Sequence, residues 1–321
     1  MDYIKFCEQT KTTVQEILGD EFSADLVNVN KLNGIVLKSL TIYKKNQTSI
    51  PNIYLESYFK DYQEGKTIDL IAQDIITFYY QCNNRKDLSC DYVMNFTLVE
   101  DKVVYKLINY DKNKKLLEKM PHFKWMDLAI IFLVIVQKDE ECTGTIMVND
   151  DIFQKWDINI NALYEHAKRN TFLLYGCNIR TMEKVLKSLI KNSFSTNIGS
   201  DTSDLDTMME ILYSENVSLS NNESKMYVLT NKIGINGATC LLYKDELNNF
   251  SKKIGSSFYI LPSSIHELIL VPSIKPIPKE ELLKMVKEVN ETEVPKEEIL
   301  SDNVYYYDSD ICQLYSLFQE E

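Results

Sequence analysis

Two serines, a histidine and a glutamate stand together inside the apolar block 258–272: Ser263, Ser264, His266 and Glu267. A serine nucleophile needs a base within hydrogen-bond reach and a third group that orients this base. Residues two or three positions apart rarely provide that geometry, and the sequence contains no G-x-S-x-G motif. We therefore expect a Pro-Ser-Ser turn between two core strands, in which serine hydroxyls cap backbone groups and His266 is hydrogen-bonded nearby. A hydrolase-like enzyme with its site near His266 is the alternative.

The three histidines of the chain are the first candidates for metal ligands: His122, His166 and His266. They form neither a His-x-x-x-His nor a His-Glu-x-x-His pair, so a metal site would have to be assembled from three distant segments. The acidic clusters at 139–141, 150–151 and 201–206 do not match the twelve-residue calcium loop. Neither phosphate-binding pattern, G-x-x-x-x-G-K-[ST] or G-x-G-x-x-G, is present. We expect no metal and no cofactor.

Three consecutive tyrosines near the C-terminal end are a further candidate site: Tyr305, Tyr306 and Tyr307. They lie between Asp302 and Asp308. Aromatic residues are enriched in protein interfaces, so this cluster with acidic edges can form an interaction surface. The same residues can instead pack on the C-terminal domain as an edge strand, and we favour this second interpretation.

The charge balance disfavours nucleic acid as a partner. The chain has 35 basic and 47 acidic residues, and its net charge is −12. An acidic chain repels a phosphate backbone unless it carries a local basic patch. The one candidate patch, at 112–119, contains the apolar residues of an ordinary amphipathic turn. The partner that we expect is therefore another protein, and the leading hypothesis is a non-catalytic protein-binding or regulatory protein.

Cysteine usage and the apolar runs indicate a cytoplasmic protein without a membrane segment. The seven cysteines are scattered and form no C-x-x-C pair, which fits reduced thiols better than a disulfide framework or a zinc knuckle. The N-terminus lacks the basic start and apolar run of a signal peptide. The longest apolar run, 128–136, has nine residues, about half of a membrane span.

Hydrophobic periodicity predicts the elements that must position these residues. Helical spacing is found at 2–18, 54–59, 68–80, 153–173 with a break at 157–159, 178–190 and 279–290. Strand patterns are found at 24–30, 35–42, 102–110, 226–231, 237–243, 258–272 and 304–307, and Asn33-Gly34 predicts a hairpin turn. Residues 128–137 and 144–148 could pair as a hairpin, whereas a buried helix over 123–136 is the alternative.

The order of these elements predicts an α+β protein, because strictly alternating βα units are absent. We expect mixed helices and mainly antiparallel sheets in two halves, joined by a polar insertion rich in Ser and Asn. The predicted boundaries are an N-terminal region at 1–191, which could split near 115–121, an insertion with a short helix at 192–224, and a C-terminal domain at 225–321.

Several phrases of the sequence carry a family resemblance. They include LINY at 107–110, MYVLTN at 226–231, LPSSIHE at 261–267, VKEVN at 286–290 and LSDNVYYYD at 300–308. With these phrases in this order, the chain resembles an uncharacterised family from anaerobic Gram-positive bacteria that is catalogued only as a domain of unknown function. The resemblance covers most of the chain and implies a bacterial cytosolic protein with no assigned activity. It supplies no functional residues that could be transferred to this sequence.

Overall fold

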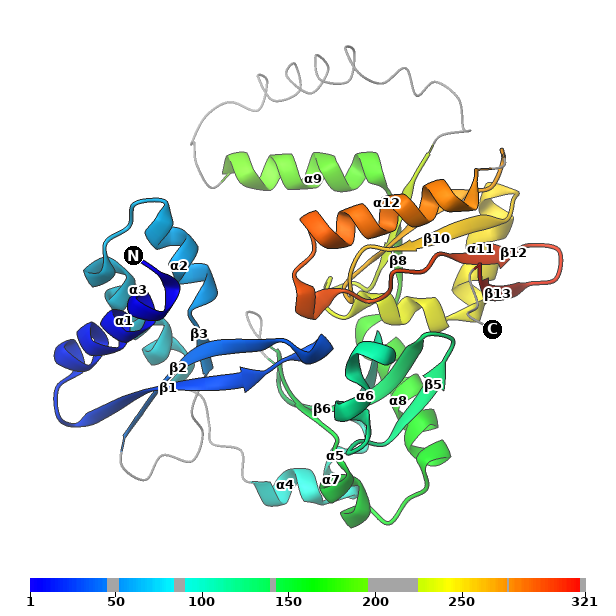
Figure 1. Cartoon of the computed structure of the whole chain (residues 1–321). Helices are drawn as coiled ribbons and strands as arrows, with labels where there is room; N and C mark the ends of the chain where they lie inside the picture. The colour runs from blue at the N-terminus through cyan, green and yellow to red at the C-terminus, as the bar shows by residue number, and fades with distance from the viewer. Residues whose placement is uncertain (45–51, 84–89, 139–142, 196–224, 276, 318–321) are drawn as a thin grey trace. The chain divides into compact units, whose positions relative to one another are not determined.

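A computed structural model describes residues 1–44, 52–83, 90–138, 143–195, 225–275 and 277–317. The chain forms two compact units, Met1–Asn95 (unit 1) and Phe96–Glu321 (unit 2), which are coloured from blue to red along the chain in Figure 1. Helices accompany sheets in which the paired strands run antiparallel, so the predicted α+β class is confirmed. None of the described helices has the length and apolar character needed to cross a membrane.

Unit 1 packs helices against the sheet β1-β2-β3 around one apolar core. Its elements are α1 (Tyr3–Leu18), β1 (Phe22–Asn30), η1 (Leu32–Gly34), β2 (Val36–Lys44), β3 (Asn52–Tyr54), α2 (Glu56–Gln63), α3 (Ile68–Asn83) and α4 (Cys90–Met94). Helix α1 begins where the Asp2 carboxylate accepts a hydrogen bond of 2.9 Å from the backbone N–H of Lys5. The predicted turn at Asn33 joins β1 to β2, with Asn33 in the left-handed region at a φ of 60°.

Unit 2 contains two sheets, and these position the functional candidates. Its first part comprises α5 (Phe96–Val99), β4 (Val103–Asn109), η2 (Asp111–Asn113), α6 (Lys114–Leu117), β5 (His122–Trp125), β6 (Leu128–Lys138), β7 (Thr143–Met147), α7 (Asp150–Lys155) and α8 (Ile160–Tyr175). The predicted β6–β7 hairpin is confirmed, and the alternative buried helix over 123–136 is wrong. Strand β6 pairs with β4 along one edge and with β5 and β7 along the other.

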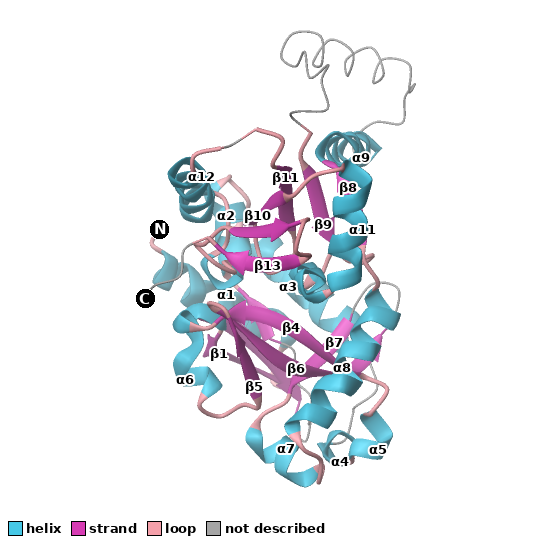
Figure 2. Cartoon of the chain, turned by 90° about the vertical axis from the view of Figure 1, so that its right-hand side faces the viewer, coloured by secondary structure: helices cyan, strands magenta, loops and turns pink. Residues whose placement is uncertain are grey.

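The second part of unit 2 builds a six-stranded sheet in the order β13-β12-β10-β11-β9-β8. Its elements are β8 (Asn178–Thr181), α9 (Met182–Ser195), β9 (Tyr227–Thr230), η4 (Gly237–Leu242), α11 (Lys244–Ile254), β10 (Phe258–Pro262), β11 (Leu268–Pro272), α12 (Lys279–Thr292), η5 (Lys296–Glu298), β12 (Tyr305–Asp308) and β13 (Gln313–Ser316). Side chains alternate between the two faces of the sheet. Tyr259 and Leu261 pack with α12, whereas Phe258 faces Phe250 of α11. The helices α12 and α11 thus lie on opposite sides of the sheet (Figure 2).

Two predicted elements of unit 2 are corrected by the structure. The helix expected from residue 178 begins only at Met182, because Asn178–Thr181 is strand β8, paired with β9. The strand expected over 237–243 is the 3-10 helix η4. Both errors concern short segments whose conformation depends on partners far away in the sequence. The short helix predicted within the polar insertion, at 205–213 of the stretch 192–224, lies outside the described residues.

The compact units differ from the predicted division of the chain. The division in the structure falls between Asn95 and Phe96, whereas the predicted boundary at 192–224 lies within unit 2. Strand β8 precedes that stretch and β9 follows it, and the two strands pair from Asn178↔Thr230 to Thr181↔Tyr227. The flanks of the predicted insertion therefore belong to the same sheet.

Candidate binding groove

The serine, histidine and glutamate candidates form the turn between β10 and β11. The backbone N–H groups of Ser263 and Ser264 donate to the carbonyl oxygen of Glu267 at 3.3 and 3.2 Å. The hydroxyl of Ser264 accepts from the N–H of His266 at 3.0 Å. Within the described residues, neither serine hydroxyl is hydrogen-bonded to the His266 ring. The structure thus brings the four residues into one turn but does not join them as nucleophile and base.

Both nitrogens of the His266 ring face a partner. Nδ1 accepts a hydrogen bond of 3.1 Å from the backbone N–H of Asn236, so the ring proton of neutral His266 lies on Nε2. Nε2 is 3.5 Å from Oε1 of Glu298, and the two side chains are 30% and 35% exposed. The ring therefore connects the loop before η4 to the segment η5. To act as a base, Nδ1 of His266 would first have to release the Asn236 N–H. The hydrolase alternative stays a prediction.

Gly237 shows how tightly this junction is packed. A Cβ atom on Gly237 would collide with the Thr230 hydroxyl and with the carbonyl oxygen of His266. These two groups are joined by a hydrogen bond of 2.8 Å from the Thr230 hydroxyl to the His266 carbonyl oxygen. Only glycine lets the backbone approach so closely, so the close approach of β9 to the β10–β11 turn depends on this residue.

The other two histidines lie on different elements of unit 2. His122 is on β5, where its Nδ1 is 2.9 Å from the carbonyl oxygen of Met120. His166 is on α8, where its ring meets the ring of Phe96 edge-on at 5.2 Å. In the part of the chain that the structure describes, no group of three or more His, Cys, Asp or Glu side chains could hold a metal ion.

The three tyrosines of the predicted interaction surface form β12, which lies between β10 and β13. Tyr305 is 0% exposed and Tyr307 is 2% exposed, while Tyr306 is half-buried between the rings of Tyr259 and Tyr315. Pairing with a strand on each side places β12 inside the sheet and not at its edge. The backbone of β12 is therefore not free to pair with a partner. Of the three tyrosines, Tyr307 lines a cavity, so a ligand could reach this side chain.

A buried polar group joins β12 to the other sheet of unit 2. The Tyr305 hydroxyl donates to Oδ1 of Asp127 at 2.8 Å, and the Ser301 hydroxyl donates to Oδ2 of the same carboxylate. Asp127 lies in the turn between β5 and β6. Complete burial, followed by the negative charge of Asp127, raises the pKa of Tyr305 well above its usual range. This side chain is therefore a neutral donor at any physiological pH.

A groove lies between the two sheets of unit 2. Its volume is about 410 Å³, within the range of small-molecule sites. Its walls are mainly apolar and aromatic side chains from both sheets, α8, η4 and α11: Trp125, Ile130, Tyr164, Leu241, Leu247 and Leu314. The groove is thus built by segments that stand almost 200 residues apart in the sequence.

A few polar groups also line the groove. They are Lys244 at the start of α11, Tyr307 of β12, Cys312 just before β13, and Gln313, the first residue of β13. The Tyr307 hydroxyl is buried and has no hydrogen-bond partner among the described residues. Burial, with smaller effects from the Cys312 thiol, raises the pKa of Tyr307 to about 12. Tyr307 therefore offers a neutral hydroxyl at the wall of the groove.

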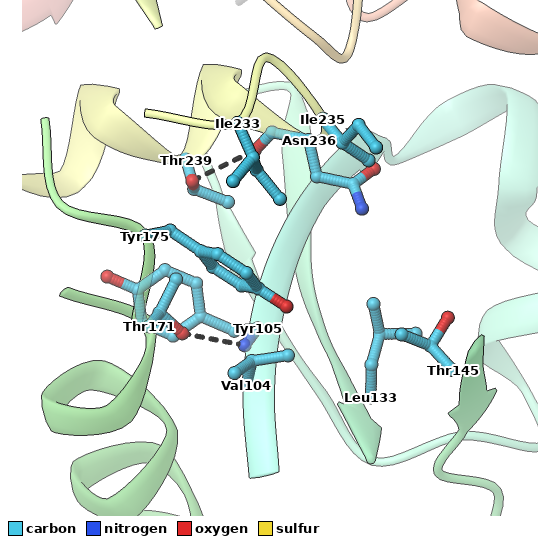
Figure 3. A pocket seen from close by; sticks show the side chains of 10 residues that line it. All are labelled: Val104, Tyr105, Leu133, Thr145, Thr171, Tyr175, Ile233, Ile235, Asn236 and Thr239. Carbon is cyan, nitrogen blue, oxygen red and sulfur yellow. Dashed lines mark hydrogen bonds between the residues drawn. The ribbon is translucent and has the colours of Figure 1, made fainter. Parts of the chain in front are cut away.

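A second, smaller cavity lies between the start of β4, the end of α8 and the loop before η4 (Figure 3). Its volume is about 60 Å³, which is room for only a few water molecules. Two of the hydroxyls around it already have partners. Thr171 accepts from the N–H of Tyr105 at 3.0 Å, and Thr239 donates to the carbonyl oxygen of Asn236 at 2.9 Å. The larger groove is therefore the better candidate for an organic ligand.

Sequence reasoning singled out only one residue of the groove, Tyr307. Nothing in the sequence distinguishes the other lining residues from ordinary core or surface positions. No local motif marks them, because each comes from a different element. The one signal was the aromatic run at 305–307, whose alternate members, Tyr305 and Tyr307, point to the same face of β12.

Comparison with curated proteins and with solved structures gives no match. A family model described as a family of unknown function, DUF5688, matches residues 3–309. This match extends over both compact units and includes the groove residues from Trp125 to Tyr307, whereas Cys312, Gln313 and Leu314 of the groove lie beyond it. It confirms the resemblance to a family without assigned activity, and the chain therefore belongs to the DUF5688 family.

Proposed function

We propose that the protein works by binding and not by catalysis, and that its binding site is the groove between the two sheets of unit 2. The observation that carries this proposal is the groove itself, about 410 Å³ in volume and walled mainly by apolar side chains. Concave apolar sites with a few polar groups are the usual form of a small-molecule site. Binding is favoured over catalysis because the lining side chains include neither a histidine nor a carboxylate that could act as a base.

The size of the groove favours a small apolar molecule as the ligand. A stable protein interface buries roughly 1,200–2,000 Å² of surface in total, whereas this groove presents a handful of side chains. A protein partner, which the sequence predicts, is the alternative occupant, and it would have to extend well beyond the groove. The expected setting of this activity, the cytoplasm of a bacterium, remains part of the proposal.

A neutral fluorescent probe tests this proposal. N-phenyl-1-naphthylamine emits more strongly in apolar surroundings, so its emission should rise when it enters the groove. The substitution Leu314→Arg places a charge in the groove wall and should abolish the rise. The matched control is Tyr315→Arg, because Tyr315 is the next residue of β13 and its ring contacts Tyr306 on the opposite face.

Circular dichroism melting curves must first show that both variants are folded. Probe binding that Leu314→Arg abolishes and Tyr315→Arg preserves supports the groove as the site. Equal binding by both folded variants would show that the probe binds elsewhere. A macromolecule that displaces the probe from the wild-type protein would identify the alternative, a protein partner, as the occupant.

A further inference from the structure

The polar groups of the groove are mainly hydrogen-bond donors. Lys244, Trp125 and a neutral Tyr307 each present an N–H or O–H group, and no Asp or Glu lines the groove. The lack of carboxylates in the lining contrasts with the net charge of the chain, which is −12. Lys244 is exposed, and no described carboxylate forms an ion pair with it. The charge of the groove therefore favours a ligand that carries an anionic, hydrogen-bond-accepting group.

The start of α11 supports the same conclusion. Lys244 is the first residue of this 11-residue helix, and the preceding Tyr243 provides no side-chain cap for its backbone N–H groups. Uncapped N–H groups at a helix start attract anions. Asp245 and Glu246 follow in the first turn, but neither lines the groove. Tyr307 gives a second indication of a ligand, which does not depend on the helix start. Its side chain lines the groove and is 2% exposed, and its hydroxyl lacks a partner among the described residues.

We propose that the ligand of the groove is an apolar molecule that ends in a carboxylate, of the fatty-acid type. The Lys244 ammonium group and the first turn of α11 bind the carboxylate. The apolar chain lies against the walls that Trp125, Leu247 and Leu314 form. This inference rests on the proposed function, since it names the chemical class of ligand for the same groove.

The experiment compares decanoate with decan-1-ol, which has the same chain length and a neutral head. Each is titrated, below the concentration at which it aggregates, against the protein loaded with N-phenyl-1-naphthylamine. Decanoate should displace the probe at lower concentration than decan-1-ol. Lys244→Gln should weaken decanoate by about fivefold, the upper value for an exposed ion pair, and should leave decan-1-ol unchanged. Lys252→Gln, in the last turn of the same helix, is the matched control and should change neither.

The outcomes separate this inference from the proposed function. If decan-1-ol displaces the probe as well as decanoate does, the groove is a binding site but the carboxylate inference is wrong. The inference is equally wrong if decanoate fails to displace a bound probe, or if Lys244→Gln and Lys252→Gln weaken decanoate to the same extent. If the probe itself does not bind to the wild-type protein, the proposed function fails.

Discussion

The hydroxyl of Tyr305 donates a hydrogen bond of 2.8 Å to Asp127, and this bond joins the two sheets of unit 2. Trp125 precedes Asp127 by two residues, and Tyr307 follows Tyr305 by two residues on the same face of β12. Both Trp125 and Tyr307 line the groove. The bond therefore helps to hold the two groove walls together, although neither Tyr305 nor Asp127 lines the groove itself.

Loss of this bond should destabilise the protein. Tyr305→Phe removes the donor and leaves Oδ1 of Asp127 without it, so the free energy of unfolding should fall by about 1–3 kcal/mol. Urea unfolding followed by circular dichroism measures this change. The control is Tyr306→Phe, since Tyr306 is the neighbouring half-buried residue on the other face of β12. An equal effect of both substitutions would contradict the assigned role of the Tyr305 hydroxyl.

Stability should decrease in strongly alkaline solution. The pKa of Tyr307 is about 12 in the folded protein and about 10 in the unfolded chain, so the unfolded chain loses this proton first. Burial penalises the ionised form of Tyr307, so this residue does not reduce the free energy of unfolding below pH 10 but lowers it as the pH rises from 10 through 12. Tyr307→Phe should therefore reduce the loss of stability between pH 10 and 12. Urea unfolding at pH 9, 10 and 11 tests this prediction, and parallel curves for the two proteins would contradict it.

At neutral pH the same substitution should be tolerated. The Tyr307 hydroxyl is buried without a partner among the described residues, so its removal breaks no hydrogen bond. We expect Tyr307→Phe to change the melting temperature little or to raise it. A marked fall, as large as that of Tyr305→Phe, would show that the Tyr307 hydroxyl has a partner that stabilises the fold.

The elements that sequence reasoning predicted well are those with local signals. The β6–β7 hairpin follows from an apolar run, a polar turn and a second apolar run, and α1 follows from its helical spacing. Strand β8 was missed because four residues carry too little periodicity, and only pairing with β9 makes them a strand. The groove also depends on contacts between distant parts of the chain, because its walls meet only after the two sheets pack together. No local pattern in the sequence could therefore predict it.

His266→Ala should damage the fold more than any activity. The substitution removes the acceptor for the Asn236 N–H and the contact with Glu298. It should lower the free energy of unfolding by about 1 kcal/mol, the lower end of the cost of leaving a polar group unpaired, because the Asn236 N–H is only partly buried. The melting temperature measures this effect. A His266→Ala protein that keeps its melting temperature but loses a measured hydrolytic activity would support the hydrolase alternative.

Gly237→Ala should be among the more harmful single-methyl additions. The new Cβ would overlap Thr230 and the His266 carbonyl, so the expected loss is near the upper end of about 1–3 kcal/mol for overpacking. Gly234→Ala is the comparison, because its Cβ would meet no atom within 4 Å and its φ of 70° carries only a backbone cost. Denaturant unfolding of the two variants should rank Gly237→Ala as the less stable.

The most direct test of the groove as a binding site uses its own tryptophan. The chain has two tryptophans; Trp125 lines the groove, whereas Trp156 is 4% exposed and packs against Phe96. Binding of decanoate should shift the tryptophan emission of the wild-type protein to shorter wavelength. In Trp125→Phe the shift should vanish while decanoate still displaces the neutral probe. A shift that persists in Trp125→Phe would place the bound molecule outside the groove and contradict the proposal.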